Sequence, residues 1–281
     1  MMNRLKRKFL DSLSGFYNEK EIRSLFFQSV QKVTGYSKSA LLANPDFPFS
    51  GEQEKQLNII LAQLLTMEPV QYILGECEFY GLPFYVNPSV LIPRSETEEL
   101  VEWILSDHSN RTGNLLDIGT GSGCIAVSVA RLLKSFSVSA IDVSASALAV
   151  AKKNAERNGC QIQFMQTDIL NPENSFEEIA FDVIVSNPPY IREQEKQQMS
   201  DNVLKYEPHL ALFVPDNDPL VFYRSISVFG KKRLKENGKL YLEINEGLGE
   251  ETVNLLSLLG YRDVVLRKDI FGKDRMIRAT R

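Results

Sequence analysis

The chain has 281 residues, 32 basic and 36 acidic, and a formal net charge of −4. This balance argues against a general nucleic-acid-binding surface, and no stretch approaches the roughly 20 apolar residues of a membrane span. Three cysteines without CxxC or zinc-like spacing indicate a reducing compartment, so we expect a cytoplasmic protein. His108 and His209 are isolated in the sequence, and we expect no metal site.

Residues 1–73 carry apolar residues at helical spacing, with breaks at Gly35 and at 44–48. This pattern predicts a small helical bundle that has no chemistry of its own and serves packing or partner docking. Between residues 74 and 94 the period changes to alternation, with turn residues at Gly81 and Pro88, which predicts a β-hairpin linker.

A helix is expected from Ser95 onward. Ser95 can cap it, and Glu98 completes a capping box before Leu100 and Val101. The cap explains Ser95 and Glu98 but leaves Arg94 unexplained.

Residues 95–281 then alternate strands and helices, which predicts an α/β domain with a parallel sheet covered by helices on both faces. Two further strands close the chain, and an antiparallel pair there is typical of one subclass. The expected strands are 115–118, 138–142, 162–165, 183–185, 240–244, 264–267 and 276–279, and the helices are 125–133, 145–158, 220–235 and 250–259.

A glycine-rich turn follows the first of these strands, with the sequence Asp-Ile-Gly-Thr-Gly-Ser-Gly at 117–123. Glycines let the backbone approach a ligand closely, and the N-terminus of the next helix presents free N–H groups. The GxGxG spacing matches neither the dinucleotide fingerprint nor a phosphate loop, so a plain structural turn is the alternative.

The next two strands end in acidic residues. Asp142, about twenty residues beyond the glycines, can accept hydrogen bonds from both hydroxyls of a ribose. Asp168 is placed to take the amino group of an adenine ring, and Ile169 to cover the face of that ring. Solvent exposure is the alternative for each acid.

A fourth strand stops at Asn187-Pro188-Pro189-Tyr190, because prolines cannot donate to a β-ladder. The Asn187 side chain and the Pro188 carbonyl can form a pair of acceptors, which suits an NH2 group, and Tyr190 adds an aromatic face. Taken alone, the tetrapeptide also fits a proline-terminated strand with a turn-forming asparagine. The four strand ends, however, meet at the edge where open α/β sheets bind ligands.

Together, the glycine-rich turn, the acidic second strand and Asn-Pro-Pro-Tyr resemble class I, Rossmann-like methyltransferases that use S-adenosyl-L-methionine to methylate a planar nitrogen. Three further stretches resemble the HemK/PrmC family, the glutamine methyltransferases of peptide chain release factors. They lie at 68–75, at 78–83 with 91–94, and at 206–212. The resemblance extends to residues 272–275 and so covers nearly the whole chain.

The resemblance implies a set of site residues. The glutamine amide of the Gly-Gly-Gln motif of a release factor is expected beside Tyr190, donating its two hydrogens to Asn187 Oδ1 and the Pro188 carbonyl, so that no general base or metal is required. Asn187, Pro188 and Tyr190 are the expected catalytic residues, and Pro189 joins them in binding substrate. The cofactor is expected to contact Gly119, Thr120, Gly121, Ser122, Gly123, Asp142, Asp168, Ile169 and Asn187.

Partners follow from the same resemblance. The helical domain is expected to hold the body of the release factor while the catalytic domain takes its loop. A monomer is expected, with no direct contact to nucleic acid or membrane. The alternatives are a methyltransferase for a glutamine of a large-subunit ribosomal protein, a nucleic-acid adenine methyltransferase, and a catalytically silent module that binds the release factor.

Two stretches depart from the family pattern. Ser95 replaces the second proline of Pro-Arg-Pro-Glu-Thr-Glu, which the expected cap makes harmless. Asn245 and Leu248 stand where Glu-Ile-Gly and Gln-Gly place glycine and glutamine. Because this stretch is remote from Asn187 in the order of motifs, we expect it to affect the packing of a late strand and not the chemistry.

Overall fold

The computed structural model describes residues 2–44, 47–172 and 179–281. It forms two compact units. Unit 1 runs to Gly75 and includes Ser200–Tyr206, whereas unit 2 comprises Glu76–Met199 and Glu207–Arg281. No helix in the described ranges is both long and apolar enough to cross a membrane.

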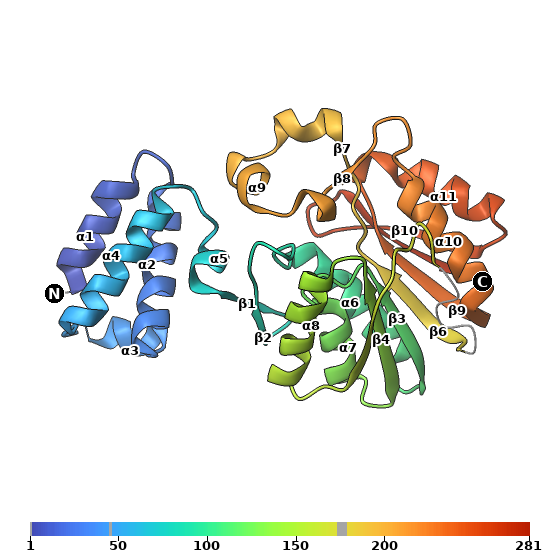
Figure 1. Cartoon of the computed structure of the whole chain (residues 1–281), viewed down its shortest axis with the longest axis horizontal. Coiled ribbons are helices and arrows are strands. Elements are labelled where there is room, and N and C mark those ends of the chain that lie inside the picture. Colours follow the sequence, from blue (N-terminus) through green and yellow to red (C-terminus); the bar gives the residue numbers. More distant parts are fainter. Residues whose placement is uncertain (1, 45–46, 173–178) are drawn as a thin grey trace. The chain divides into compact units, whose positions relative to one another are not determined.

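Unit 1 is helical, as the periodicity predicts (Figure 1). Asn18 caps one helix by accepting from the Glu21 amide, and that helix ends at Gly35, which adopts a left-handed conformation. Ser50 and Gln53 form a reciprocal capping box, and the predicted break at 44–48 includes residues 45 and 46, which lie outside the described ranges. The helices are α1 (Met2–Leu13), α2 (Glu19–Thr34), α3 (Lys38–Ala43), α4 (Gly51–Leu64), α5 (Val70–Leu74) and α9 (Asp201–Tyr206).

The short helix α9 belongs to unit 1 although it lies far along the sequence. The Tyr206 hydroxyl is 2.8 Å from the Thr66 carbonyl oxygen and 2.9 Å from Thr66 Oγ1. A helix of six residues has too few turns for its apolar pattern to indicate which helices it packs against.

Unit 2 is built on a seven-stranded sheet in the order β10-β11-β9-β6-β3-β4-β5. The strands from β9 to β5 pair in parallel, and β11 pairs antiparallel with both β9 and β10, so the expected antiparallel closing pair is confirmed. The bounds are β3 (Gly113–Ile118), β4 (Phe136–Asp142), β5 (Ile162–Gln166), β6 (Phe181–Ser186), β9 (Leu234–Glu243), β10 (Arg262–Lys268) and β11 (Asp274–Thr280).

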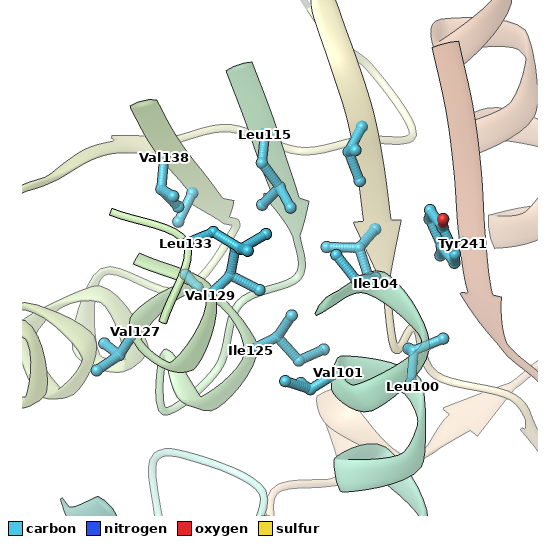
Figure 2. Packing of buried hydrophobic residues seen from close by; sticks show 14 of the residues in the cluster. Leu100, Val101, Ile104, Leu115, Ile125, Val127, Val129, Leu133, Val138 and Tyr241 are labelled. Carbon is cyan, nitrogen blue, oxygen red and sulfur yellow. The ribbon is translucent and has the colours of Figure 1, made fainter. Parts of the chain in front are cut away.

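Side chains on these strands alternate between two buried faces. Leu115 and Tyr241 belong to the core on one face, which Figure 2 shows packed against helix side chains, whereas Leu116 and Leu242 belong to the core on the other. Both faces being apolar is the pattern of a sheet covered on both sides. Helices α6 (Ser95–His108), α7 (Cys124–Leu132) and α8 (Ala145–Arg157) contribute to the first core, and α10 (Val221–Arg233) and α11 (Gly249–Leu258) to the second.

A hairpin of β1 (Glu76–Phe79) and β2 (Leu82–Tyr85) opens unit 2. Asn154 of α8 accepts from the Tyr85 amide at 2.6 Å and donates to the Tyr85 carbonyl at 2.9 Å. Its Nδ2 also lies 2.8 Å from the Ser122 carbonyl oxygen. One buried side chain therefore links the hairpin to the glycine-rich turn.

The capping box predicted for Ser95 and Glu98 is wrong. Arg94 occupies the cap position of α6 without a side-chain cap, and the Ser95 hydroxyl donates to Glu96 instead. The Glu98 carboxylate accepts from the Tyr80 amide at 2.6 Å. An acid in the first turn of a helix can serve a neighbouring hairpin as well as its own helix.

Shorter elements fill the connections on either side of α9. Strands β7 (Ile191–Arg192) and β8 (Phe213–Val214) pair in parallel. Three 3₁₀ turns complete the described structure: η1 (Glu193–Gln198), η2 (His209–Ala211) and η3 (Glu246–Leu248).

Candidate functional site

A cavity of about 400 Å³ opens at the carboxyl ends of β3, β4, β5 and β6, within unit 2. This is the edge at which open α/β sheets bind ligands, and the volume falls in the range of small-molecule sites, roughly 300–1,000 Å³. Its floor comes from the four strand ends predicted from the sequence, at 118–122, 141–144, 167–169 and 186–189.

The glycine-rich turn lines the cavity from Gly119 to Ser122. Gly121 has φ of 54°, in the left-handed region that favours glycine. Gly123 does not face the cavity: it has φ of 81°, and an added Cβ there would lie 3.1 Å from the Ala151 side chain. The glycine at 123 thus permits a close approach of α7 to α8, and its predicted contact with the cofactor stays a prediction.

Asp117 stabilises this turn by hydrogen bonds. Its Oδ2 accepts from Thr120 Oγ1 at 2.6 Å and from the Ala126 amide at 3.2 Å. The side chain is fully buried, and burial raises its pKa from 3.8 to about 7. Asp117 thus shapes the turn without itself lining the cavity.

Asp142 lines the cavity beside the turn. Its two carboxylate oxygens accept from the backbone amides of Gly121 at 2.8 Å and Ser144 at 2.9 Å. Burial raises the pKa of this carboxyl, while the two amides favour the charged form. Each oxygen keeps a lone pair for a further donor, which suits a diol such as ribose.

Asp168 and Ile169 line the next part of the wall. Asp168 Oδ1 accepts from the Leu170 amide at 2.9 Å, which fixes the carboxylate, and the Ile169 side chain is buried. Both residues thus line the cavity, and their predicted contacts with an adenine ring stay a prediction.

Asn187, Pro188 and Pro189 line the cavity at the end of β6. Asn187 Nδ2 donates to the Thr97 hydroxyl at 3.2 Å. Thr97 is itself buried and lines the cavity, and its hydroxyl lies 2.6 Å from Glu243 Oε2. The amide of Asn187 is therefore held by Thr97 of α6, and Thr97 in turn is held by Glu243 of β9.

Tyr190 is not among the described residues that line the cavity, and its predicted contact with a substrate amide stays a prediction. Its hydroxyl donates to Glu243 Oε1 at 3.1 Å, and its ring packs against the second core. Burial raises the pKa of both groups, Tyr190 and Glu243. The hydroxyl thus holds the Glu243 carboxylate on the side opposite Thr97.

Residues 243–249 are remote from Asn187 in the order of motifs, but hydrogen bonds connect them to the Asn187–Tyr190 turn. Glu243 reaches Asn187 through Thr97, and Asn245 Nδ2 donates to the Tyr190 carbonyl at 3.0 Å. The signal that could have found Glu243 is an acid at the end of an apolar parallel strand, the same signal that identified Asp142.

Arg94, Asp142 and Asp168 are the charged side chains among the described residues that line the cavity. Arg94 pairs at 2.7 Å with Glu207, whose side chain is only 1% exposed. Glu207 Oε2 also accepts from the Ile92 amide at 3.4 Å. The buried Glu207 carboxylate therefore fixes the position of Arg94, the residue that the predicted helix cap left unexplained.

Across the described ranges, the structure holds no group of three or more His, Cys, Asp or Glu side chains arranged to bind a metal ion. His108 is buried with its Nε2 3.2 Å from the Tyr241 hydroxyl, and burial lowers its pKa to about 4. Its surroundings are those of a packing residue.

Two known families match the chain. The Methyltransferase small domain family matches residues 96–208, and the PrmC N-terminal domain family matches residues 29–75. The first match contains the cavity-lining ends of β3 to β6.

Two curated relatives share most of the chain. The release factor glutamine methyltransferase of Flavobacterium psychrophilum is 48% identical over 99% of this chain and 98% of its own length. The release factor glutamine methyltransferase of Bacteroides thetaiotaomicron is 43% identical, with 100% of both chains covered.

Solved structures share the fold at lower identity. The catalytic domain of hMettl16 in complex with a MAT2A 3′UTR hairpin has a TM-score of 0.57 and 19% identity, covering 75% of this chain and 80% of that one. The T. thermophilus 16S rRNA N2 G1207 methyltransferase in complex with AdoMet and guanosine has a TM-score of 0.54 and 20% identity, covering 73% of this chain and 49% of that one.

Proposed function

Because the chain belongs to the release factor glutamine methyltransferase family, we propose that it methylates the glutamine side-chain amide in the Gly-Gly-Gln motif of peptide chain release factors. The methyl donor is S-adenosyl-L-methionine, and S-adenosyl-L-homocysteine is the product. The observation that carries the proposal is that Asn187 and Pro188 line the same cavity as the Gly119–Ser122 turn, Asp142 and Asp168.

The residues present fit the cofactor. Asp142, with both oxygens already oriented by backbone amides, would hold the ribose hydroxyls. Asp168 and Ile169 would contact the adenine edge and face, and the turn at Gly119–Ser122 would let the backbone approach the remainder of the molecule. When bound, this cofactor supplies a methyl group carried on a positively charged sulfur.

Asn187 and Pro188 prepare the nitrogen that receives the methyl group. An amide nitrogen is a weak nucleophile because its lone pair is shared with its carbonyl group. Asn187 Oδ1 and the Pro188 carbonyl accept its two hydrogens and so aim the lone pair along the line of transfer. Both acceptors bind more strongly as the nitrogen becomes positive, which lowers the barrier.

The bound cofactor would supply the methyl group to this nitrogen, which would then lose one proton to solvent. No side chain has to act as a strong base in this step. The aromatic contact of Tyr190 with the substrate amide stays a prediction, since its hydroxyl is engaged by Glu243.

Unit 1 is proposed to dock the body of the release factor, while unit 2 takes the Gly-Gly-Gln loop. Intact protein can test this by comparing KM for a full-length release factor with KM for a short Gly-Gly-Gln peptide. We expect the full-length substrate to have the lower KM, and a variant shortened to begin at Glu76 to lose that advantage while keeping its KM for the peptide.

We further propose that the protein acts as a monomer in the cytoplasm and on protein, not on nucleic acid. The net charge of −4 supports a protein substrate, because nucleic-acid enzymes of this fold need a basic surface. Transfer of a labelled methyl group to release factor, ribosomal protein and DNA, assayed side by side, separates the candidates. Incorporation into DNA alone would overturn the proposal.

A further inference from the structure

Glu243, Thr97 and Asn187 form a continuous hydrogen-bonded chain that ends at the cavity. Thr97 Oγ1 lies 2.6 Å from Glu243 Oε2 and 3.2 Å from Asn187 Nδ2. Glu243 is 1% exposed and Thr97 2% exposed, so water does not compete for the contact between them. The chain links the C-terminal end of β9, the first turn of α6 and the end of β6.

The direction of the hydrogens in this chain follows from the groups involved. Burial raises the pKa of Glu243, but the hydroxyls of Thr97 and Tyr190 and the positive charge of Arg275 all favour its ionised form. An ionised carboxylate only accepts, so the single hydroxyl proton of Thr97 is directed to Glu243. Thr97 Oγ1 is then left to accept, and only the NH2 branch of the Asn187 amide can donate to it. The carbonyl branch, Oδ1, is the one left for a ligand in the cavity.

We infer that Glu243 is a positioning residue that acts through Thr97 to keep the Asn187 amide oxygen turned toward the substrate. This rests on the proposed function, in which that oxygen accepts a hydrogen from the glutamine amide. Turned the other way, Asn187 would present its own NH2 group to the NH2 group of the substrate.

Tyr190 completes the arrangement from the other side. Its hydroxyl donates to Glu243 Oε1 at 3.1 Å, so the carboxylate receives one hydroxyl on each oxygen. Arg275 adds a favourable positive charge, whereas Glu96 opposes it. A buried carboxylate is costly unless it is paired in this way, and replacing Glu243 with an amide would allow the order of donors to reverse.

Three variants and one control test this role. Thr97→Val removes the hydroxyl but keeps the shape, Thr97→Ser keeps the hydroxyl, and Glu243→Gln keeps the size but can donate. The control is Thr252→Val, because Thr252 is also a fully buried threonine, its hydroxyl donates to the Leu248 carbonyl at 2.7 Å, and it lies outside the cavity lining.

Two readouts separate positioning from packing. The first is kcat for a release factor at saturating S-adenosyl-L-methionine, together with the affinity for that cofactor. The second is the ¹⁵N–¹H resonance of Asn187 Nδ2 in asparagine-labelled protein, assigned with Asn187→Asp, which reports the hydrogen bond to Thr97 whether or not the protein turns over.

We expect Thr97→Val and Glu243→Gln to lower kcat by about 10- to 100-fold, somewhat less than the loss of a direct contact. Both should shift the Asn187 resonance, while cofactor affinity stays within about threefold. Thr97→Ser should keep kcat and the Asn187 resonance close to their wild-type values, and Thr252→Val should change neither of them.

An unchanged kcat and an unshifted Asn187 resonance in Thr97→Val would overturn the inference, even if Glu243→Gln failed to fold. A wild-type protein that methylates no release factor would overturn the proposed function instead. In that event the resonance alone still decides whether Glu243 and Thr97 orient Asn187.

Discussion

Asn245 donates from its side-chain amide to the main-chain carbonyl of Tyr190 over 3.0 Å. The same side chain accepts from the Gly247 amide at 2.8 Å, and Asn245 is only 6% exposed. A residue that departs from the family pattern therefore holds the last position of Asn-Pro-Pro-Tyr.

Replacing Asn245 with alanine should lower the free energy of unfolding by about 1 to 2 kcal/mol, because the partly buried carbonyl of Tyr190 loses a donor. It should also lower kcat severalfold by loosening the turn that carries Asn187. Urea denaturation and steady-state kinetics measure the two effects. Wild-type values in both would show that the contact is dispensable.

Replacing Asn187 with alanine should reduce kcat by roughly 30- to 1000-fold, which corresponds to about 2 to 4 kcal/mol of lost transition-state stabilisation. The reason is the loss of one of the two acceptors that aim the substrate nitrogen. Single-turnover kinetics at saturating cofactor isolate this step. If Asn187→Ala keeps wild-type turnover, the proposed mechanism is wrong.

Asp117 should make stability depend on pH. Its pKa is raised from 3.8 to about 7 on folding, so in this window the folded chain holds a proton that the unfolded chain has lost. The free energy of unfolding should therefore fall as pH rises through the window, with a slope of at most about 1.4 kcal/mol per pH unit, and level off above it.

Asp117→Asn should make the slope shallower by the Asp117 contribution, because the amide keeps an acceptor for Thr120 but does not titrate, while Asp142 and Glu243 still contribute. The measurement is urea denaturation across the window for wild type and variant. Asp11→Asn is the control, since the Asp11 side chain is 71% exposed and should keep the wild-type slope. Parallel curves for wild type and Asp117→Asn would contradict the account.

Arg94→Ala should lower the free energy of unfolding by roughly 1 to 3 kcal/mol, because it leaves the buried Glu207 carboxylate without its cation. The cost is below that of a fully buried pair, since the Arg94 side chain is 35% exposed. Arg4→Ala is the matched control: its pair with Glu54 joins side chains that are 69% and 24% exposed, and less than about 1 kcal/mol is expected. Equal losses in both variants would argue against a special role for the pair at the cavity.

The sheet and the floor of the cavity could be predicted from the sequence because both depend on local patterns. Apolar runs that end in Asp142, Asp168 or Asn187 identify strand ends, and the carboxyl ends of parallel strands meet at one edge. Chain order then places those side chains together without knowledge of any long-range contact.

The hydrogen bonds that connect Asn187 to Thr97 and Thr97 to Glu243 could not be predicted in this way. Thr97 and Glu243 are 146 residues apart, and nothing in either neighbourhood indicates the other. The capping box at Ser95 failed for a related reason, because Glu98 serves a hairpin that the helix pattern does not contain. The placement of α9 with unit 1 likewise depends on the contact between Tyr206 and Thr66.

Methylation of the release factor is best tested by mass spectrometry after incubation with this protein and S-adenosyl-L-methionine. We expect a gain of one methyl group, mapped to the glutamine of Gly-Gly-Gln and strongly reduced with Asn187→Ala. A release factor that stays unmethylated, while a parallel titration shows bound cofactor, would contradict the claim and direct attention to a ribosomal-protein glutamine.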